Sequence, residues 1–464
     1  MKAKTLDKQE YRKNMMLVDS IPKIIIKMSI PTIIAFIINS VYSLADTYFV
    51  SALGTDATAA VSVNSSLDQF IMMAGSLFAV GANSYIARLL GAKDEQKASR
   101  VLSTAFWLSA AFGTIIMVLG VAFMRPMVRL LGAMPSSEQY AVDYATYVLL
   151  VAPFMATSFV MNQCLRAEGS AILSMFGMGF GGILNIFLDW LFVARWGMGV
   201  TGASIATAIS KVVSFAILIS PYIFRRSMLR IKFKLIELSK DIIGQIVSVG
   251  ASSMLRSGLA VVSAIVLNNI AGEISVSVQA GIGVTTRVMM FPFSIILGFG
   301  TGFQPVAGFN WGAGRCDRVR ESFRFASWVS IVGSIIMAAV LYIGAEWVIG
   351  LFNGTTTDAM MMEIGALSIR LQSIALPIHA WVATVNMFCS GLGRAKGAML
   401  LATARQGTCF LPFIHLLAHL FGANGVAAVQ AFADVLTLAL ALPLIRKVMR
   451  DVKQTELLQK QNLA

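Results

Sequence analysis

The stretch SIPTIIAFIINSVYSLADTYFVSALG, residues 29–54, is apolar along most of its length and contains a single acid, Asp46. A helix of about 20 apolar residues crosses the hydrocarbon core of a bilayer, which is about 30 Å thick. Asn39, Ser43 and Asp46 recur at helical spacing, so they form one polar stripe along such a helix. The stretch therefore predicts a membrane-spanning helix with one polar face.

Similar apolar stretches recur along all 464 residues, of which 57% are hydrophobic and only 13% are charged. A soluble protein of this length would carry about twice that charged fraction. The stretches predict twelve transmembrane helices, so we expect an all-α integral membrane protein. The predicted spans lie near residues 24–50, 58–87, 101–123, 139–163, 170–194, 201–224, 242–268, 276–304, 325–349, 364–389, 397–421 and 425–445.

Lysine and arginine outnumber the acids 37 to 23, and they concentrate in the connections on one side of the predicted membrane. Short connections rich in Lys and Arg face the cytoplasm. We therefore expect both termini to be cytoplasmic, and the net charge of +14 requires no nucleic-acid partner. The most basic of these connections are 88–100, 225–234, 314–324 and the segment after Arg446.

The two halves of the chain resemble each other. ARLLGAKDEQKASR (87–100) corresponds to AGFNWGAGRCDRVR (307–320), and LRAEGSAILSM (165–175) corresponds to CSGLGRAKGAM (389–399). Six spans separate the copies, so the repeat is parallel, as in many secondary transporters. We expect two six-helix lobes with a substrate site between them. The predicted parts are an N-terminal segment 1–23, a first lobe 24–224, a linker 225–241, a second lobe 242–445 and a tail 446–464.

Several polar residues of the first lobe share one depth in the predicted membrane. Counted from the outer ends of their spans, Asp46, Tyr144, Asp189 and Thr207 all lie roughly 7–9 Å inside, at about 1.5 Å per residue. Asn185 lies one turn deeper than Asp189 on the same helix face. These residues predict a polar cluster formed by four different helices.

Such a cluster could load and release a positive charge. Acids within a span are costly, so they normally face a cavity or a partner and mark function. Two neighbouring carboxylates repel each other when both are ionised, which raises their pKa, so one of them tends to hold a proton near neutral pH. Alternatively, the carboxylate, amide and hydroxyl oxygens could bind a small hard cation such as sodium. The competing interpretation is that Asp46 and Asp189 only form hydrogen bonds within the bundle.

The second half lacks these acids. The repeat places Leu267, Cys409 and Phe413 opposite Asp46, Asn185 and Asp189. Its spans instead contain arginines, which either satisfy backbone carbonyls and the interface or line the cavity; they are Arg256, Arg287, Arg370 and Arg405. We therefore expect the coupling ion to bind in the first half.

Three weaker signals remain. Asp68 and Asp434 lie deeper in their spans and could be secondary ion or substrate groups. His415 and His419 are four residues apart, as in a metal pair, but no third ligand is evident and zinc needs three or four. We expect no metal site beyond a possible sodium ion at the first-lobe cluster, and no cofactor.

The order and spacing of several segments resemble the multidrug and toxic compound extrusion (MATE) transporters, in particular their prokaryotic DinF-like branch. The resemblance covers about residues 20–445. It is carried by residues 29–54, by RLLGAKDEQKA (88–98), NQCLRAEG (162–169), NIFLDWLFV (185–193), GVTGASIATAIS (199–210) and FQPVAGFNWGAGR (303–315).

The resemblance implies an antiporter of the prokaryotic cytoplasmic membrane, which exchanges small, often cationic, organic drugs for inward-moving sodium or protons. It assigns Asp46, Tyr144, Asn185, Asp189 and Thr207 to ion coupling. It also places Asn39, Tyr42 and Asn162 along the first-lobe substrate cavity. Another branch has an acid where this chain reads GASSMLRSGLA (250–260), so the resemblance disfavours coupling through the second lobe.

We expect this antiporter to act as a monomer in the lipid bilayer. Two other functions remain open from the sequence. A lipid-linked oligosaccharide flippase would have a related architecture. A membrane-embedded enzyme would need a nucleophile–base pair or a metal triad, and the predicted spans contain neither. An enzyme is therefore the least favoured of the three.

Overall fold

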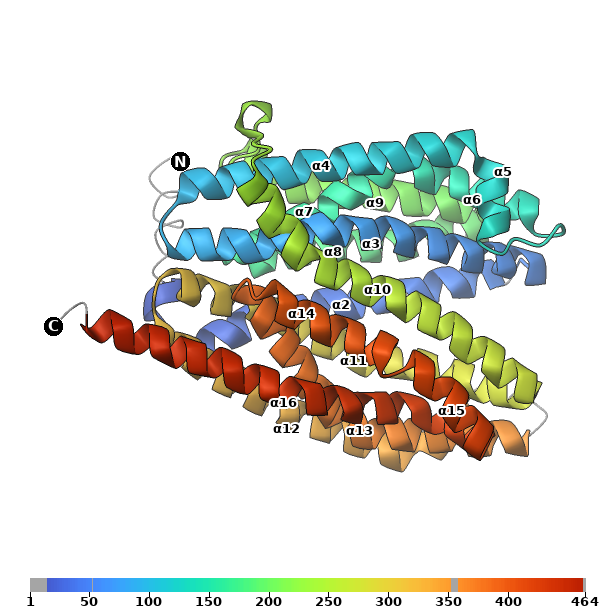
Figure 1. Cartoon of the computed structure of the whole chain (residues 1–464). Helices are drawn as coiled ribbons and strands as arrows, with labels where there is room; N and C mark the ends of the chain where they lie inside the picture. Colours follow the sequence, from blue (N-terminus) through green and yellow to red (C-terminus); the bar gives the residue numbers. More distant parts are fainter. Residues whose placement is uncertain (1–14, 52, 352–357, 462–464) are drawn as a thin grey trace.

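The computed structural model describes residues 15–51, 53–351 and 358–461, which form helices joined mostly by short turns, with one longer connection between Ile223 and Lys240 (Figure 1). The helices of the first half are α2 (Ile21–Ser51), α3 (Thr55–Gly91), α4 (Glu95–Ala122), α5 (Met124–Leu130), α6 (Glu138–Leu150), α7 (Ala152–Ala167), α8 (Ala171–Asp189), the π-helix η1 (Trp190–Arg195) and α9 (Gly199–Ile223). The short 3-10 helix η2 (Phe233–Leu235) lies in the linker. The second half contains α10 (Lys240–Ile274), α11 (Val276–Gly312), α12 (Cys316–Gly350), α13 (Ala359–Gly391), α14 (Ala395–Thr403), the π-helix η3 (Ala404–Thr408), α15 (Leu411–Phe421) and α16 (Ala423–Gln461).

The helices account for the twelve predicted spans. Ten helical segments of the described chain are long and apolar enough to cross a membrane, and the pair α6 and α7, bent by 53°, forms one further span. One of the ten segments runs from Ala395 to Gln459 and contains two spans, because the chain reverses at Gly422 between α15 and α16. The all-α fold with two six-helix lobes is confirmed (Figure 1).

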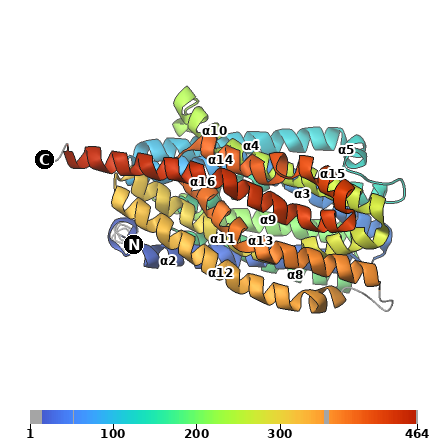
Figure 2. The same ribbon diagram turned by 60° about the horizontal axis from the view of Figure 1, so that its bottom comes forward.

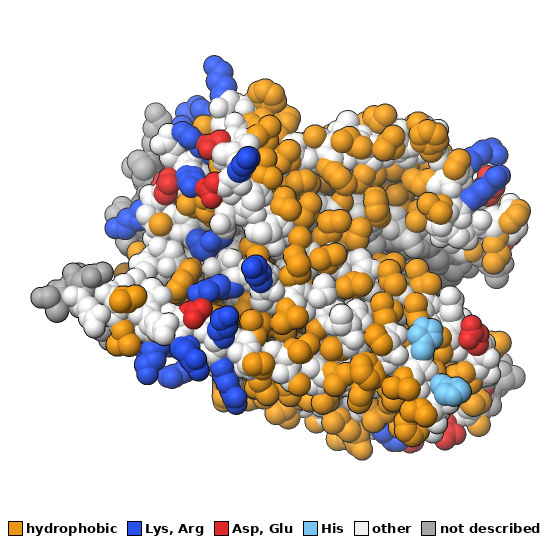
Figure 3. All heavy atoms as spheres, viewed as in Figure 1, with side chains coloured by type: hydrophobic (Ala, Val, Ile, Leu, Met, Phe, Trp, Pro, Cys, Tyr) orange, Lys and Arg blue, Asp and Glu red, His pale blue; other side chains and the backbone are white. Residues whose placement is uncertain are grey.

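Charged residues gather at one end of the molecule, which we call the basic end. Figure 3 shows Lys and Arg side chains crowded there, while the middle of the visible surface shows many hydrophobic side chains and hardly any charged ones. The turns at this end are short, because helices continue to Gly91 and Gly312 and resume at Glu95 and Cys316. Polar side chains begin the next helices, as when Asp94 accepts a hydrogen bond from the Lys97 amide at 2.9 Å.

The two lobes are joined at the basic end and separate at the other. One continuous apolar cluster at the basic end contains residues of both lobes, including Ile24 and Leu102 from the first and Phe303 and Val319 from the second. Toward the far end the buried clusters belong to one lobe each. The core therefore fuses the halves on one side of the membrane only.

Hydrogen bonds between the lobes close the basic end. Ser84 on α3 donates to the Ser390 carbonyl on α13. Ser29 on α2 donates to the Phe299 carbonyl on α11 at 3.2 Å, and Arg88 donates to Gln245 at 2.9 Å. These bonds join opposite lobes, so opening this end requires all three to break.

The internal repeat is visible in matching contacts. Asn162 donates to the Ser174 carbonyl at 3.1 Å, and Asn386 donates to the Ala398 carbonyl at 2.7 Å. Each asparagine lies twelve residues before its acceptor and in the corresponding place of its own lobe. The same local structure therefore occurs once in each half, as the sequence repeat predicts.

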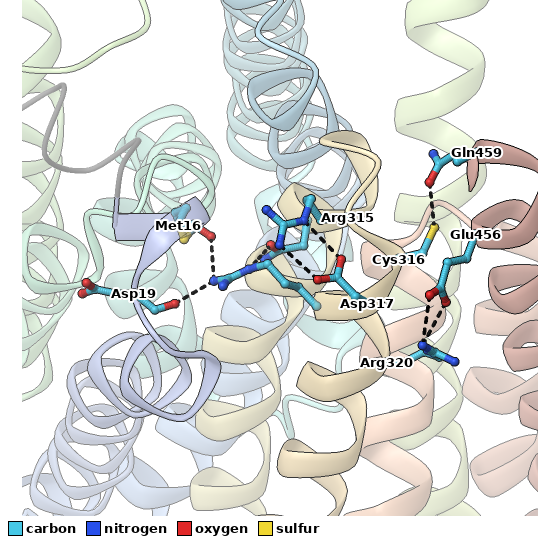
Figure 4. Close-up of polar contacts among 10 residues, drawn as sticks. Met16, Asp19, Arg315, Cys316, Asp317, Arg320, Glu456 and Gln459 are labelled. Atoms are coloured by element: carbon cyan, nitrogen blue, oxygen red, sulfur yellow. Dashed lines mark hydrogen bonds and ion pairs between the residues drawn. The ribbon is translucent and has the colours of Figure 1, made fainter. Parts of the chain in front are cut away.

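The segment before α2 and the last part of α16 both contact α12 at the basic end. Arg318 donates to the carbonyl oxygens of Asp19 at 2.7 Å and Met16 at 3.3 Å, which anchors the segment before α2. Arg320 forms an ion pair with Glu456 of α16 at 2.9 Å (Figure 4). The expected tail is therefore helical as far as Gln461 and extends beyond the bundle (Figure 2). Residues 1–14 of the expected N-terminal segment lie outside the described residues.

A polar cluster and two cavities

Four helices bring the predicted first-lobe residues together at the end away from the basic end. Asp46 lies on α2, Tyr144 on α6, Thr207 on α9, and Asn185 and Asp189 on α8. All five are buried, and Asp189 is 0% exposed. Residues taken from distant parts of the sequence thus meet at one level, which the depth count predicts from the fixed rise of a helix.

A chain of hydrogen bonds connects four of these five side chains. Tyr144 donates to an Asp46 carboxylate oxygen at 3.2 Å, and its hydroxyl lies 3.3 Å from the Thr207 hydroxyl. Asn185 donates to the Thr207 hydroxyl at 3.3 Å. Asp189 has no hydrogen bond to the other four, although it is close enough to Asp46 to interact electrostatically.

Four buried oxygen atoms of this cluster lack a donor within the described protein. They are Asp46 Oδ1, Asn185 Oδ1, Asp189 Oδ1 and Asp189 Oδ2. A buried carboxylate without a donor is costly, so these atoms call for a proton, a cation or water. All four atoms are hydrogen-bond acceptors. A group of acceptors without donors can bind a proton or a metal cation.

The helix changes form directly after Asp189. The α-helical bonding of α8 ends there, and η1 continues as a π-helix. Single π-turns inside helices are uncommon and often occur at functional sites. The sequence contains no Pro or Gly within 185–193 that would have indicated this change.

The predicted substrate residues Asn39, Tyr42 and Asn162 line one cavity inside the first lobe. Asn185 and Thr207 line the same cavity, which connects it to the polar cluster. Its volume is about 70 Å³, which suits an ion and a few waters. A drug-sized ligand needs a pocket of about 300–1,000 Å³.

Lys211 is a residue of this cavity that the sequence did not assign. Its ammonium group donates to the Tyr42 hydroxyl at 3.0 Å and lies 4.9 Å from the centre of the Tyr42 ring. A basic residue inside a predicted span was the available signal, but the sequence does not show which way the side chain points. The first-lobe cavity therefore contains a lysine ammonium group, whereas the adjoining polar cluster contains the carboxyl groups of Asp46 and Asp189.

A much larger cavity lies between the lobes. Its volume is about 570 Å³, and α2, α3, α7 and α8 of the first lobe and α10, α11 and α13 of the second contribute to its walls. Methionine and phenylalanine provide much of the lining, including Met72, Met178, Met387, Phe36 and Phe159. Flexible thioethers and aromatic rings can adapt to apolar ligands of different shape. This cavity has the size that a small organic substrate needs.

The family model MatE matches residues 31–191 and 252–413 of the chain, one match in each lobe. The chain belongs to the MatE family. The resemblance noted in the sequence is thereby confirmed, and the protein is a multi-pass membrane transporter and not an enzyme.

Relatives of this MatE protein cover almost its full length. The multidrug export protein MepA of Staphylococcus aureus (strain NCTC 8325 / PS 47) is 29% identical over 92% of this chain and 94% of its own. MepA of Staphylococcus saprophyticus is 27% identical over 95% of this chain and 97% of its own. A multidrug resistance MATE family transporter solved in an outward-facing conformation is 25% identical, with a TM-score of 0.88 over 95% of this chain and 98% of that one.

The second lobe of this MatE protein contains a charged cluster of a different kind. Arg405 of η3 and Asp434 of α16 form an ion pair of 2.5 Å, with side chains 14% and 5% exposed. His379 lies 3.7 Å from the same carboxylate, and the Arg405 guanidinium lies 4.9 Å from the centre of the Phe293 ring. Asp434, considered from the sequence as a secondary ion or substrate group, is thus held by an arginine.

Four other sequence candidates, Arg287, Arg370, His415 and His419, do not line either cavity. Arg370 pairs with Glu346 at 2.8 Å, and Arg287 is exposed on α11. His415 and His419 are both exposed on α15. Within the described ranges, no three His, Cys, Asp or Glu residues are grouped closely enough to hold a metal ion.

Proposed function

We propose that this protein exports small organic compounds by exchanging them for inward-moving sodium or protons, with Asp46 and Asp189 as the coupling carboxylates. The observation that carries the proposal is the set of four buried acceptor oxygens without donors that Asp46, Asn185 and Asp189 bring together in the first-lobe polar cluster. A protein that only needed structural hydrogen bonds there would pair them. The names of the staphylococcal relatives support the export of drugs.

The coupling ion would bind among Asp46, Asn185, Asp189 and Thr207, with Tyr144 positioning Asp46. Thr207 accepts from Asn185, and Tyr144 donates to Asp46, so both contacts preorganise oxygens on neighbouring helices. Sodium accepts oxygen ligands of this kind, and a proton could bind to either carboxylate instead. Asn39, Tyr42 and Asn162 would contact substrate when the first-lobe cavity widens.

The way the lobes meet supports transport by alternating access. The described lobes share a core and several hydrogen bonds at the basic end, and they have separate cores at the far end. With the basic end in the cytoplasm, as its lysines and arginines favour, this arrangement corresponds to a state closed toward the cytoplasm. The second state would break the basic-end contacts and close the far end. We place the protein in the prokaryotic cytoplasmic membrane with both termini inside.

One chain supplies both lobes and the cavity, which supports a monomer as the working unit. Substrates with an apolar body fit the methionine-rich and phenylalanine-rich walls of the inter-lobe cavity. The first-lobe acids would favour cationic drugs, whereas Lys211 in the neighbouring cavity would oppose them.

The deciding experiment measures ethidium transport by the purified chain in vesicles, with sodium and proton gradients imposed separately. Gradient-driven ethidium movement through wild-type protein is the expected result. Equal movement without any gradient would contradict antiport. Transfer of a fluorescent lipid-linked oligosaccharide between leaflets, without ethidium movement, would favour the flippase instead.

A further inference from the structure

The inter-lobe cavity contains one charged side chain, and its charge is positive. Arg256 of α10 lines the cavity, and none of the described residues that line it is acidic. Its guanidinium donates a hydrogen bond to the Ser253 hydroxyl on the same helix at 3.0 Å. No ion pair among the described residues involves Arg256, in contrast to Arg370 and Arg405.

A second donor in the same wall lacks a partner. Gln304 of α11 is 1% exposed, lines the cavity, and its Nε2 atom has no hydrogen-bond acceptor in the described protein. Buried amide groups without partners are uncommon, and each asks for an explanation. An acceptor on a bound molecule would satisfy Gln304 Nε2 and the free donors of Arg256 together.

The rest of the wall suits an apolar body attached to such an acceptor. Methionine and phenylalanine side chains from α2, α3, α7, α8 and α13 surround the space, and serines of α10 lie beside Arg256. A guanidinium binds carboxylate, sulfonate or phosphate through charge-assisted hydrogen bonds that are stronger than neutral ones. A positive wall without any acid disfavours a bound cation at this position.

From these observations we propose that the inter-lobe cavity binds amphipathic organic anions, with Arg256 and Gln304 holding the acidic group and the Met- and Phe-rich walls holding the apolar body. The substrate class would thus include soluble organic acids as well as, or in place of, cations. The transport of such acids rests on the proposed antiport function, whereas their binding does not.

The test uses two probes that share one fluorophore and differ in charge. Dansylglycine carries a carboxylate and dansylcadaverine carries an ammonium group. Equilibrium binding of each is measured by fluorescence on the full chain in nanodiscs of phosphatidylcholine, without any ion gradient. We expect Arg256→Gln to weaken dansylglycine binding about tenfold or more, because a charge-assisted bond is lost. Dansylcadaverine binding should stay the same or become tighter.

Two further variants separate charge from folding. Arg256→Lys keeps the positive charge and should retain most of the dansylglycine affinity. Arg287→Gln removes one positive charge from the exposed face of α11, outside the cavity, and should leave the affinity unchanged. Equal weakening by Arg287→Gln, or unchanged dansylglycine binding in Arg256→Gln, would overturn the proposal.

A lipid headgroup is the alternative anion, and a second membrane composition tests it. Nanodiscs containing phosphatidylglycerol should leave wild-type dansylglycine binding intact. If phosphatidylglycerol displaced dansylglycine from the wild-type protein but not from Arg256→Gln, the cavity would bind a lipid headgroup. That result would overturn the proposal that it binds a soluble acid. These binding measurements need no ion gradient, so they test anion binding separately from antiport. Loss of the Arg256 effect with intact ethidium antiport would contradict only the anion site. Arg256-dependent binding without ethidium antiport would contradict only the proposed antiport.

Discussion

The interiors of the two lobes handle buried charge in opposite ways. In the first lobe, Asp189 is completely buried and neither of its carboxylate oxygens has a donor. In the second lobe, Asp434 is buried almost as deeply but lies 2.5 Å from Arg405. The Asp189 carboxylate therefore needs a positive charge from outside the protein, whereas the Asp434 carboxylate is already paired with Arg405.

This difference teaches how to separate a coupling acid from a structural one. Burial alone does not distinguish them, because both aspartates are buried in a span. What distinguishes them is whether the protein supplies the counter-charge. A carboxylate with a permanent arginine partner has little to gain from sodium or a proton, whereas an unpaired one gains a great deal.

The largest effect is expected from Asp46→Asn and Asp189→Asn. Each variant should reduce gradient-driven ethidium export to the level of vesicles without protein, because an amide keeps the shape but cannot exchange charge. The thermal stability of Asp189→Asn should be unchanged or higher, since an unsatisfied buried carboxylate is removed. Export and thermal unfolding are measured on the same preparations.

His415→Ala and His419→Ala provide the control, because both side chains are exposed on α15. They should retain most of the transport. Full export by Asp46→Asn or Asp189→Asn at equal membrane abundance would show that the first-lobe acids are structural. The buried acids of the two lobes would then not differ in function.

A smaller effect on transport, with a larger one on stability, is expected in the second lobe. Asp434→Asn leaves Arg405 buried without a counter-charge, which typically costs about 3–5 kcal/mol. The folded fraction should fall, but the export per folded molecule should remain. Chemical unfolding monitored by tryptophan fluorescence gives the stability, and vesicle assays normalised to folded protein give the export.

Arg370→Gln is the matched control for this pair. Its partner Glu346 is 67% exposed and Arg370 is 38% exposed, so the loss should be about 0–1 kcal/mol. If Asp434→Asn abolished export without destabilising the protein, Asp434 would join the coupling residues and the Arg405–Asp434 pair would no longer be purely structural.

The smallest effect is expected at the basic end, where the charges are solvated. Lys97 and Tyr85 donate to Asp241 at 2.8 and 2.9 Å, and these hydrogen bonds, that of Lys97 first, hold the pKa of Asp241 below its usual value. A lowered carboxyl pKa stabilises the folded state above the unfolded pKa of about 3.9. That stabilisation is lost as the pH falls through the folded-state pKa.

Asp241→Asn should therefore cost roughly 0.2–1 kcal/mol at pH 7, a value kept low because the Asp241 side chain is 53% exposed. The difference from the wild type should shrink as the pH falls below about 4. Thermal unfolding at pH 7 and at acidic pH measures both values. A difference that grew toward acidic pH would contradict the sign of the linkage.

The sequence predicts the spans and the level of the first-lobe cluster because both depend on a fixed rise per residue. Counting along each helix brought Asp46, Tyr144 and Thr207 to one depth, and the structure connects them by hydrogen bonds. Depth is a local property of a helix, so no knowledge of its neighbours is required.

The rotation of a helix and the identity of its neighbours are not local properties, so they are harder to predict from the sequence. Arg256, Arg370 and Arg405 look alike as basic residues in spans. One faces a cavity, one an exposed glutamate and one a buried aspartate. Which of these occurs depends on how α10, α13 and η3 pack against other helices. The π-turn after Asp189 and the position of Lys211 were missed for the same reason.

The contact between α3 and α11, where the two halves meet, suggests how the repeat arose. A side chain at Gly91 of α3 would begin 2.0 Å from the Phe309 carbonyl oxygen of α11, and one at Gly312 of α11 would begin 1.9 Å from the Arg88 carbonyl oxygen of α3. Each repeat thus offers the other a glycine and a carbonyl in the same positions. Two identical six-helix chains, paired about a twofold axis, would form this contact twice without any new residue. The junction that now joins the lobes is therefore one that an unduplicated ancestor could already have used to dimerise.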